Sequence, residues 1–119
     1  MLEEPEDPTE ISLHLPVQES LKHQVWLGLQ NEDELHFSVG HLWCEYFPCT
    51  DPQKVQNYID AVFGFLSGTY RSLEHYRGSE CFKAELQRPA LSGWETIATW
   101  SKLRLPSLRK VTYKEVVNA

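Results

Sequence analysis

The sequence lacks any long apolar segment. No run approaches the roughly 20 consecutive apolar residues that a membrane-spanning helix needs, and the acidic N-terminus has neither the basic nor the apolar region of a secretory signal peptide. The three cysteines, Cys44, Cys49 and Cys81, cannot all pair within one chain, so we expect reduced thiols. These features predict a cytoplasmic protein that does not interact with a membrane.

Persuasive metal and nucleotide motifs are also missing. The Ser-Gly-Thr segment 67–69 lacks the lysine and the spacing of a phosphate-binding loop. Four residues of the types that bind zinc follow one another along the chain: His36, His41, Cys44 and Cys49. They lack the short spacings of zinc-binding pairs and lie mostly on one predicted strand, whose side chains alternate between faces. We therefore expect no metal and no cofactor.

Positive charge is scarce in the first half of the chain. The net charge is −6, with −10 on residues 1–60 and +4 on residues 61–119. Basic residues gather near the C-terminus, close to Trp100 and Tyr113, at Lys102, Arg104, Arg109, Lys110 and Lys114. A basic patch with aromatic neighbours can bind nucleic acid, but the acidic first half would repel a polyanion. Nucleic-acid binding is therefore kept as a secondary alternative.

The strongest positive signal predicts a helix over residues 51–77. Asp51 followed by Pro52 is a typical helix start, and Gly78 is a typical stop. Apolar residues recur between them at helical spacing, at Val55, Ile59, Val62, Leu66, Tyr70 and Leu73. Gly64 and Gly68 weaken the pattern, so a break near Gly68 into two shorter helices is the alternative.

Alternating apolar residues predict strands on both sides of this helix. The alternating sets span residues 11–15, 25–29, 35–46, 82–86, 94–100 and 111–113, and the third changes phase at Gly40 as a β-bulge would. We predict an α+β fold in which one antiparallel sheet of five to six strands carries the helix across one face, in the order βββ-α-βββ. Residues 1–9 are predicted to form a flexible acidic tail, and residues 10–119 a single domain.

The sheet face opposite the helix is the predicted partner-binding surface. An acidic turn could attract a basic protein, and exposed aromatic residues could anchor it. The residues predicted to contribute are Glu32, Asp33, Glu34, Glu45, Trp26, Trp43 and Tyr46.

In general character, a small, acidic, aromatic-rich α+β chain of this kind resembles bacterial immunity proteins and antitoxins. The resemblance implies neutralisation of a toxin or enzyme by direct binding, and a second copy of the chain is the other candidate partner. The alternative is a small cytoplasmic hydrolase or transferase, in which a histidine would meet a cysteine or a carboxylate. Scattered histidines and carboxylates, with no distinctive spacing, favour binding over catalysis.

Overall fold

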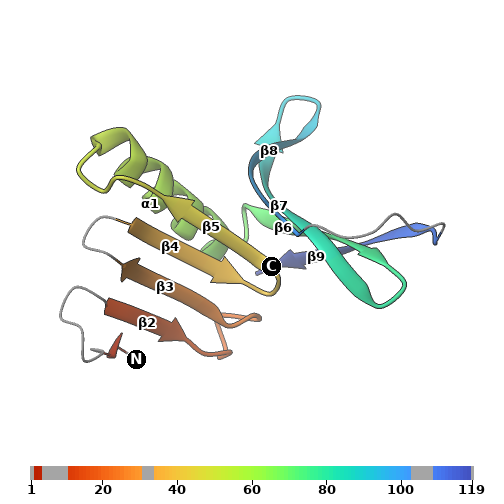
Figure 1. The fold of residues 1–119 in the computed structure, drawn as a ribbon, viewed down its shortest axis with the longest axis horizontal. Helices are drawn as coiled ribbons and strands as arrows, with labels where there is room; N and C mark the ends of the chain where they lie inside the picture. Colours follow the sequence, from red (N-terminus) through yellow and green to blue (C-terminus); the bar gives the residue numbers. More distant parts are fainter. Residues whose placement is uncertain (1, 4–10, 31–33, 103–108, 119) are drawn as a thin grey trace.

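The computed structural model describes residues 2–3, 11–30, 34–102 and 109–118. Within these ranges the chain forms one helix between two groups of strands (Figure 1). The strands before the helix are β1 (Leu2–Glu3), β2 (Ile11–Leu15), β3 (Val25–Gln30), β4 (Glu34–Val39) and β5 (Leu42–Tyr46). Helix α1 (Pro52–Leu66) is followed by β6 (Arg71–Arg77), β7 (Glu80–Ala90), β8 (Gly93–Ser101) and β9 (Val111–Val117).

The strands form two antiparallel sheets. The first has the order β1-β2-β3-β4-β5, and the second has the order β8-β7-β6-β9. The predicted α+β class with antiparallel strands is confirmed, but the predicted single sheet is wrong. Five described strands precede the helix and four follow it, whereas the sequence predicts three on each side.

Helix α1 begins as predicted and ends earlier. The Asp51 carboxylate accepts the Gln53 N–H at 2.9 Å, which satisfies a free donor of the first turn. The helix ends at Leu66 rather than near Gly78, since Gly68 adopts a φ of +80° and the Tyr70 N–H turns back to donate to Gly64 O at 2.8 Å. The chain then enters β6, so neither one long helix nor two shorter helices is correct.

The predicted bulge at Gly40 is instead a tight turn between two strands. Val39 and Leu42 are paired, which leaves Gly40 and His41 as the two-residue connection between β4 and β5. Gly40 has a φ of +57°, the left-handed conformation that such turns require. A β-bulge and a two-residue turn can each change the phase of an alternating pattern. Because the structure has the turn, β4 and β5 are separate strands of one hairpin.

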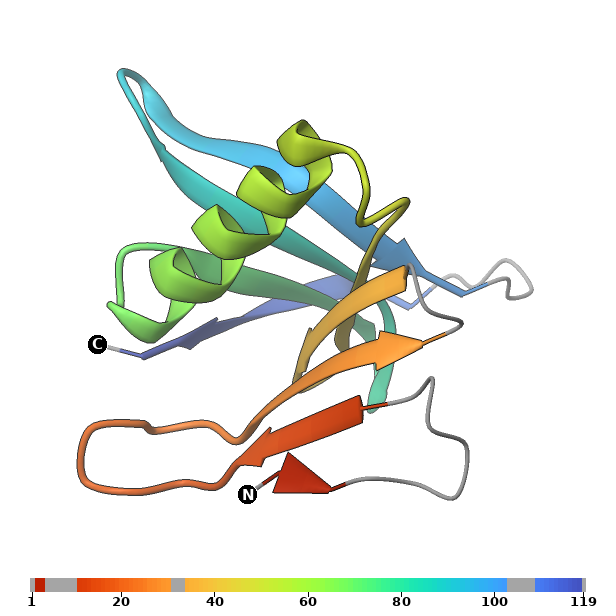
Figure 2. The ribbon, with the colours of Figure 1, turned by 90° about the vertical axis from the view of Figure 1, so that its left-hand side faces the viewer.

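The hydrophobic core lies where the helix and both sheets meet (Figure 2). Helix α1 packs on β4 and β5, and β5 also contacts β7 and β8 of the second sheet. The buried core residues from these three units are Val25, Phe37, Val39, Leu42, Cys44, Ala61, Val62, Phe65, Ala84, Leu86 and Val116, and Leu21 joins them from the connection between β2 and β3. The helix therefore covers one face of the first sheet, which leaves that sheet's opposite face as the surface of interest.

Two polar side chains join distant parts of the chain. The buried Glu74 carboxylate of β6 accepts the His41 N–H at 2.9 Å, so it holds the β4–β5 turn against the second sheet. Beyond β9, Asn118 donates to Leu66 O at 2.7 Å and to Ser20 O at 3.1 Å. It also accepts the Lys22 N–H at 2.7 Å. Asn118 thus ties the end of the helix to the segment before β3.

The predicted acidic tail, residues 1–9, falls largely outside the described residues. Its described part, β1, pairs with β2 through Leu2 opposite Leu13 and Glu3 opposite Ser12. Among the residues that the structure describes, no helix combines the length and the apolar character that crossing a membrane requires.

Candidate protein-binding surface

Strand register assembles one continuous surface on the first sheet. Side chains alternate between the two faces of a strand, and the sheet face that packs on the helix carries Phe37 and Cys44. The opposite face is called the outer face here. It consists of Ser12, His14, Trp26, Gly28, Gln30, Glu34, His36, Ser38, Trp43 and Glu45. Its central row runs across four strands, from His14 through Trp26 and Ser38 to Trp43.

Both outer-face tryptophans are exposed but held in place. Trp26 is 44% exposed, and its ring stacks on His14 at a centroid separation of 3.9 Å and an interplanar angle of 12°. Trp43 is 40% exposed, and its indole N–H donates to a Glu45 carboxylate oxygen at 2.8 Å. Because these contacts restrict each ring before any partner arrives, binding through them loses little conformational entropy.

A buried histidine lies beside Trp43. The His36 side chain is 6% exposed, and its ring centroid is 4.7 Å from that of Trp43. Among the described residues neither ring nitrogen has a hydrogen-bond partner, and Nε2 is 3.6 Å from a Glu34 carboxylate oxygen. Gly28 is the residue opposite His36 on β3, so no side chain from that position competes for the space. His36 therefore fills the sheet surface between Trp43 and Glu34.

A shallow cavity of about 320 Å³ adjoins Trp26. It is lined by Val17, Lys22, His23, Gln24, Trp26, Ser38 and Gly40. Val17 is 62% exposed, so one wall presents apolar surface to solvent. A concavity beside an exposed aromatic ring suits the side chain of a partner protein.

The structure brings together some of the predicted partner-binding residues. Trp26, Trp43, Glu34 and Glu45 lie on the outer face, whereas Glu32 and Asp33 lie outside the described residues. Tyr46 points to the other face, where it is half-buried against Tyr58 at a ring-centroid separation of 5.6 Å. The sequence-based prediction that Tyr46 shares a surface with Trp43 is wrong, because residues three apart on a strand face opposite ways.

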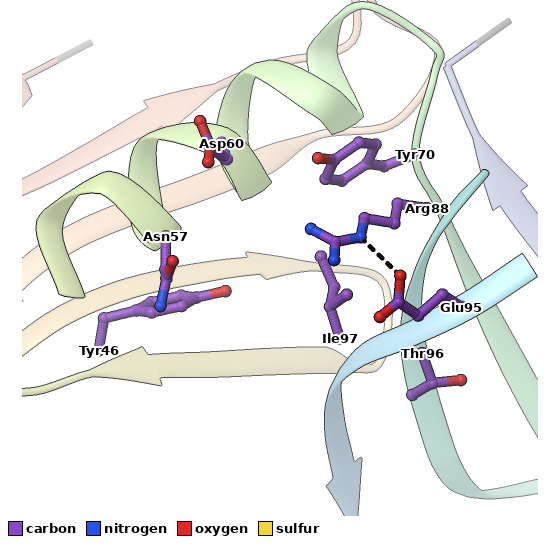
Figure 3. A pocket seen from close by; sticks show the side chains of 8 residues that line it. All are labelled: Tyr46, Asn57, Asp60, Tyr70, Arg88, Glu95, Thr96 and Ile97. Atoms are coloured by element: carbon purple, nitrogen blue, oxygen red, sulfur yellow. Dashed lines mark hydrogen bonds and ion pairs between the residues drawn. The ribbon is translucent and has the colours of Figure 1, made fainter. Parts of the chain in front are cut away.

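Tyr46 instead borders a second cavity, of about 290 Å³, between the helix and the second sheet (Figure 3). Its lining residues are Tyr46, Asn57, Asp60, Tyr70, Arg88, Glu95, Thr96 and Ile97. At one end of this cavity Arg88 donates to a Glu95 carboxylate oxygen at 3.0 Å. The lining is polar and mixed in charge, which is typical of a solvated cleft between two packed elements.

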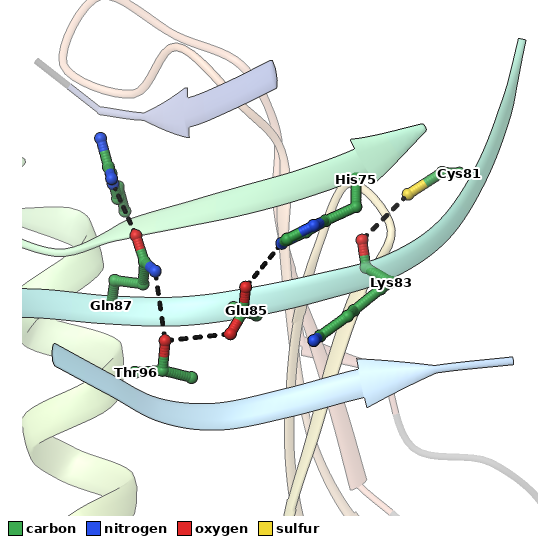
Figure 4. Close-up of polar contacts among 7 residues, drawn as sticks. His75, Cys81, Lys83, Glu85, Gln87 and Thr96 are labelled. Atoms are coloured by element: carbon green, nitrogen blue, oxygen red, sulfur yellow. Dashed lines mark hydrogen bonds and ion pairs between the residues drawn. The ribbon is translucent and has the colours of Figure 1, made fainter. Parts of the chain in front are cut away.

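The second sheet carries a polar network that the sequence did not predict (Figure 4). His75 Nε2 and a Glu85 carboxylate oxygen are 2.5 Å apart, and Thr96 donates to the other Glu85 oxygen at 3.0 Å. The rings of Phe82 and Tyr113 flank His75 at centroid separations of 6.1 and 4.9 Å. A histidine oriented by a carboxylate can act as a general base. However, His75 does not line either cavity described above.

Arg71 extends this network across the sheet. It donates to Gln87 at 2.9 Å and to Glu115 at 2.8 Å, and its guanidinium carbon lies 4.1 Å from the centre of the Trp94 ring. Gln87 in turn donates to Thr96 at 3.1 Å. These contacts link β6 to β7 and β9 and lead on to β8, so the network stabilises the sheet.

The structure describes four of the five basic residues near the C-terminus, Lys102, Arg109, Lys110 and Lys114. Lys102 pairs with Glu80 at 3.3 Å. Tyr113 and Lys114 are consecutive on β9 and therefore point to opposite faces. Arg104 lies outside the described residues. Tyr113 thus points away from Lys114, whereas the register across β8, β7, β6 and β9 places Trp100 on the same face of the sheet as Lys114.

Burial sets the chemistry of Cys44. All three cysteines are free thiols, and Cys44 is buried on the helix-facing side of β5. Burial raises the pKa of this thiol from 9.0 to about 12, and a weaker hydrogen bond with Tyr46 acts in the opposite direction. The same cause, burial, raises the pKa of Tyr58 to about 12. These groups therefore remain neutral at physiological pH.

We expect Cys44 to resist alkylation in the folded protein. At pH 8 the shift lowers the thiolate fraction about 1,000-fold relative to a thiol of pKa 9, and the thiolate is the reactive form. Iodoacetamide labelling, resolved by residue with mass spectrometry, should leave Cys44 unmodified in buffer and modify it in urea. Equal labelling rates in the two conditions would contradict the burial of this thiol.

No protein-family model, curated protein or solved structure matches this chain.

Proposed function

We propose that this protein is a non-enzymatic, cytoplasmic binding module that recognises another protein through the outer face of its first sheet. In its most concrete form, this role is the neutralisation of a basic toxin or enzyme, as immunity proteins and antitoxins do. The observation that carries the proposal is the pair of exposed but restrained tryptophans, Trp26 and Trp43. Such aromatic residues dominate the binding energy of protein interfaces when a partner desolvates them.

The charge of the outer face indicates the kind of partner. Glu34 and Glu45 are the charged residues among the ten that define this face, and neither lysine nor arginine is among those ten. In the sequence, Glu34 follows directly after Glu32 and Asp33. A basic partner would be drawn to this surface and oriented on it, since complementary charge chiefly accelerates association.

Tryptophan substitutions test the proposal. Trp26→Ala and Trp43→Ala should each weaken partner binding by about 2 kcal/mol or more, roughly 30-fold, as hot-spot residues do. The protein can be used as bait in native lysate, and captured proteins identified by mass spectrometry. Affinities of the variants for the captured protein are then measured by calorimetry. Substitution of Glu34 and Glu45 by lysine should slow association and reduce its dependence on salt.

Trp94→Ala is the matched control. Trp94 is 44% exposed, as Trp26 is, but it lies on the second sheet over Arg71. Its replacement should leave the affinity unchanged. A partner whose binding depends on Trp94, and not on Trp26 or Trp43, would contradict the proposed surface. If a second copy of this chain were the only protein captured, the partner would be that copy, and the surface would form a homodimer instead of binding a basic protein.

The pair formed by His75 and Glu85 supports a second candidate function, a hydrolase or transferase that uses His75 as a general base. The binding role is preferred because the two described cavities are lined by other residues. Turnover that disappears in a His75→Gln variant and survives in Trp43→Ala would favour the enzyme.

A further inference from the structure

Three side chains of different chemistry converge where the two sheets meet. The imidazole of His41, the carboxylate of Glu74 and the thiol of Cys81 each offer one ligand atom, and these three atoms lie within 4.8 Å of one another. His41 belongs to the β4–β5 turn of the first sheet, whereas Glu74 is on β6 and Cys81 on β7 of the second. These three residues come from separate parts of the sequence, so no local sequence motif predicts the cluster.

The Glu74 carboxylate is held in a fixed orientation. Its side chain is 1% exposed, and one oxygen accepts the Tyr76 hydroxyl at 2.7 Å while the other accepts the His41 backbone N–H at 2.9 Å. An ionised carboxylate has about four acceptor positions, so two hydrogen bonds leave capacity for a cation. Donors that orient a ligand in this way are typical of the outer shell of a metal site.

The local backbone leaves room for this arrangement. A Cβ atom at Gly40 would lie 2.6 Å from a Glu74 carboxylate oxygen, so a side chain there would displace the carboxylate. A register shift between His75 and Tyr76 places Cys81 opposite Tyr76 on the neighbouring strand, two residues from Glu74. Glu74 and Cys81 are buried and His41 is exposed, so a cation could reach the cluster from the solvent side.

We propose that His41, Glu74 and Cys81 form a binding site for Zn²⁺ or a closely similar divalent transition-metal ion. One sulfur, one nitrogen and one oxygen ligand suit zinc, which binds all three types, whereas Ca²⁺ and Mg²⁺ prefer oxygen ligands. Tetrahedral coordination requires ligand atoms about 3.5 Å apart, so the cluster needs to contract by about 1 Å. The exposed His41 ring, on a turn, can make that movement. Three protein ligands leave a fourth position for water.

Zinc binding would tie the two sheets together. His41 comes from the first sheet and the other ligands from the second, so the ion would add a cross-link at a junction already made by the Glu74 hydrogen bond. This role is independent of the outer-face surface, whose residues do not include these three.

The test uses the full chain, stripped with a chelator and titrated with ZnCl₂ in competition with a chromophoric chelator. We expect one Zn²⁺ per chain. At a free concentration 100 times the Kd, Zn²⁺ should raise the Tm by roughly 10 °C. Substitution with Co²⁺ should give intense visible bands of tetrahedral cobalt and a charge-transfer band from the Cys81 thiolate.

His41→Ala is the decisive variant because it removes the imidazole but keeps the backbone N–H that binds Glu74. Its Zn²⁺ affinity should fall more than about 100-fold, since even residues outside the first shell contribute 10- to 100-fold. Cys81→Ser should remove the charge-transfer band. His23→Ala and Cys49→Ser are the controls, and both should bind as the unmodified chain does.

Two results would overturn this site. One is the absence of stoichiometric Zn²⁺ binding at micromolar concentration. The other is binding that His41→Ala leaves unchanged, which would place the ion elsewhere on the chain. Partner capture through Trp26 and Trp43 would be unaffected by either result, so the two proposals can fail separately.

Discussion

Replacement of Phe65 by alanine is expected to lower the free energy of unfolding by about 3–5 kcal/mol, as for other large core aromatics. The Phe65 side chain is 0% exposed, and its ring lies 5.9 Å from that of Phe37 on β4. It therefore fills the contact between α1 and the first sheet, and its removal leaves a cavity that two rigid elements cannot close. Urea denaturation followed by far-UV circular dichroism measures the loss.

Phe63→Ala provides the control for this prediction. Phe63 lies on the same helix two residues earlier, but its side chain is 65% exposed. The same change in chemistry should therefore alter stability by no more than about 0.5 kcal/mol, the usual range for surface substitutions. Similar losses in the two variants would mean that α1 does not pack with Phe65 toward the core.

Gly40→Ala is expected to have the second largest effect, a loss of about 3 kcal/mol. Forcing alanine into the left-handed backbone of this turn accounts for about 1–2 kcal/mol. The added Cβ would also lie 2.6 Å from a Glu74 carboxylate oxygen, so the buried carboxylate must give up hydrogen bonds worth about 1–3 kcal/mol when lost. Thermal and urea unfolding of the variant measure the total.

Gly93→Ala separates these two causes. Gly93 also has a positive φ, +135°, but a Cβ atom there meets no atom of the described part of the chain within 4 Å. Its replacement should therefore show backbone strain without the collision. If Gly40→Ala cost no more than the roughly 1–2 kcal/mol expected of the left-handed backbone alone, the close contact between the turn and Glu74 would be refuted.

Much of the strand structure was predictable because apolar residues alternate there. The predicted sets at residues 11–15, 25–29, 82–86, 94–100 and 111–113 all fall within observed strands. Such alternation predicts which strand residues are buried, but it does not show which sheet a strand joins. The number of sheets was not predictable, since it depends on contacts between strands distant in the sequence.

The predicted continuation of the helix failed for a specific reason. In β6 the buried residues are polar: Ser72 is 0% exposed and Glu74 is 1% exposed. A pattern that scores apolar residues cannot identify such a strand, and Tyr70 and Leu73 happened to continue the helical spacing. Gly68, with its positive φ, was the informative residue at this boundary.

The candidate surface was only partly predictable. Trp26, Trp43 and Glu45 occupy the outer face as alternation requires. Glu45 restrains Trp43 from the same strand, but the His14 ring that stacks on Trp26 comes from the neighbouring strand through register. The cluster of His41, Glu74 and Cys81 could not be predicted because strand β6, which carries Glu74, was itself not predicted. A helix at residues 71–77 would have directed Glu74 elsewhere.

The links made by Asn118 bear on when the chain can fold during synthesis. This residue joins the end of α1 and the segment before β3, which lie 52 and 98 residues earlier in the chain. Ribosomes deliver the polypeptide from its N-terminus, and early segments can begin to organise as they emerge. The first sheet and helix can therefore form while translation continues, but their final closure must wait until β9 and Asn118 have left the exit tunnel.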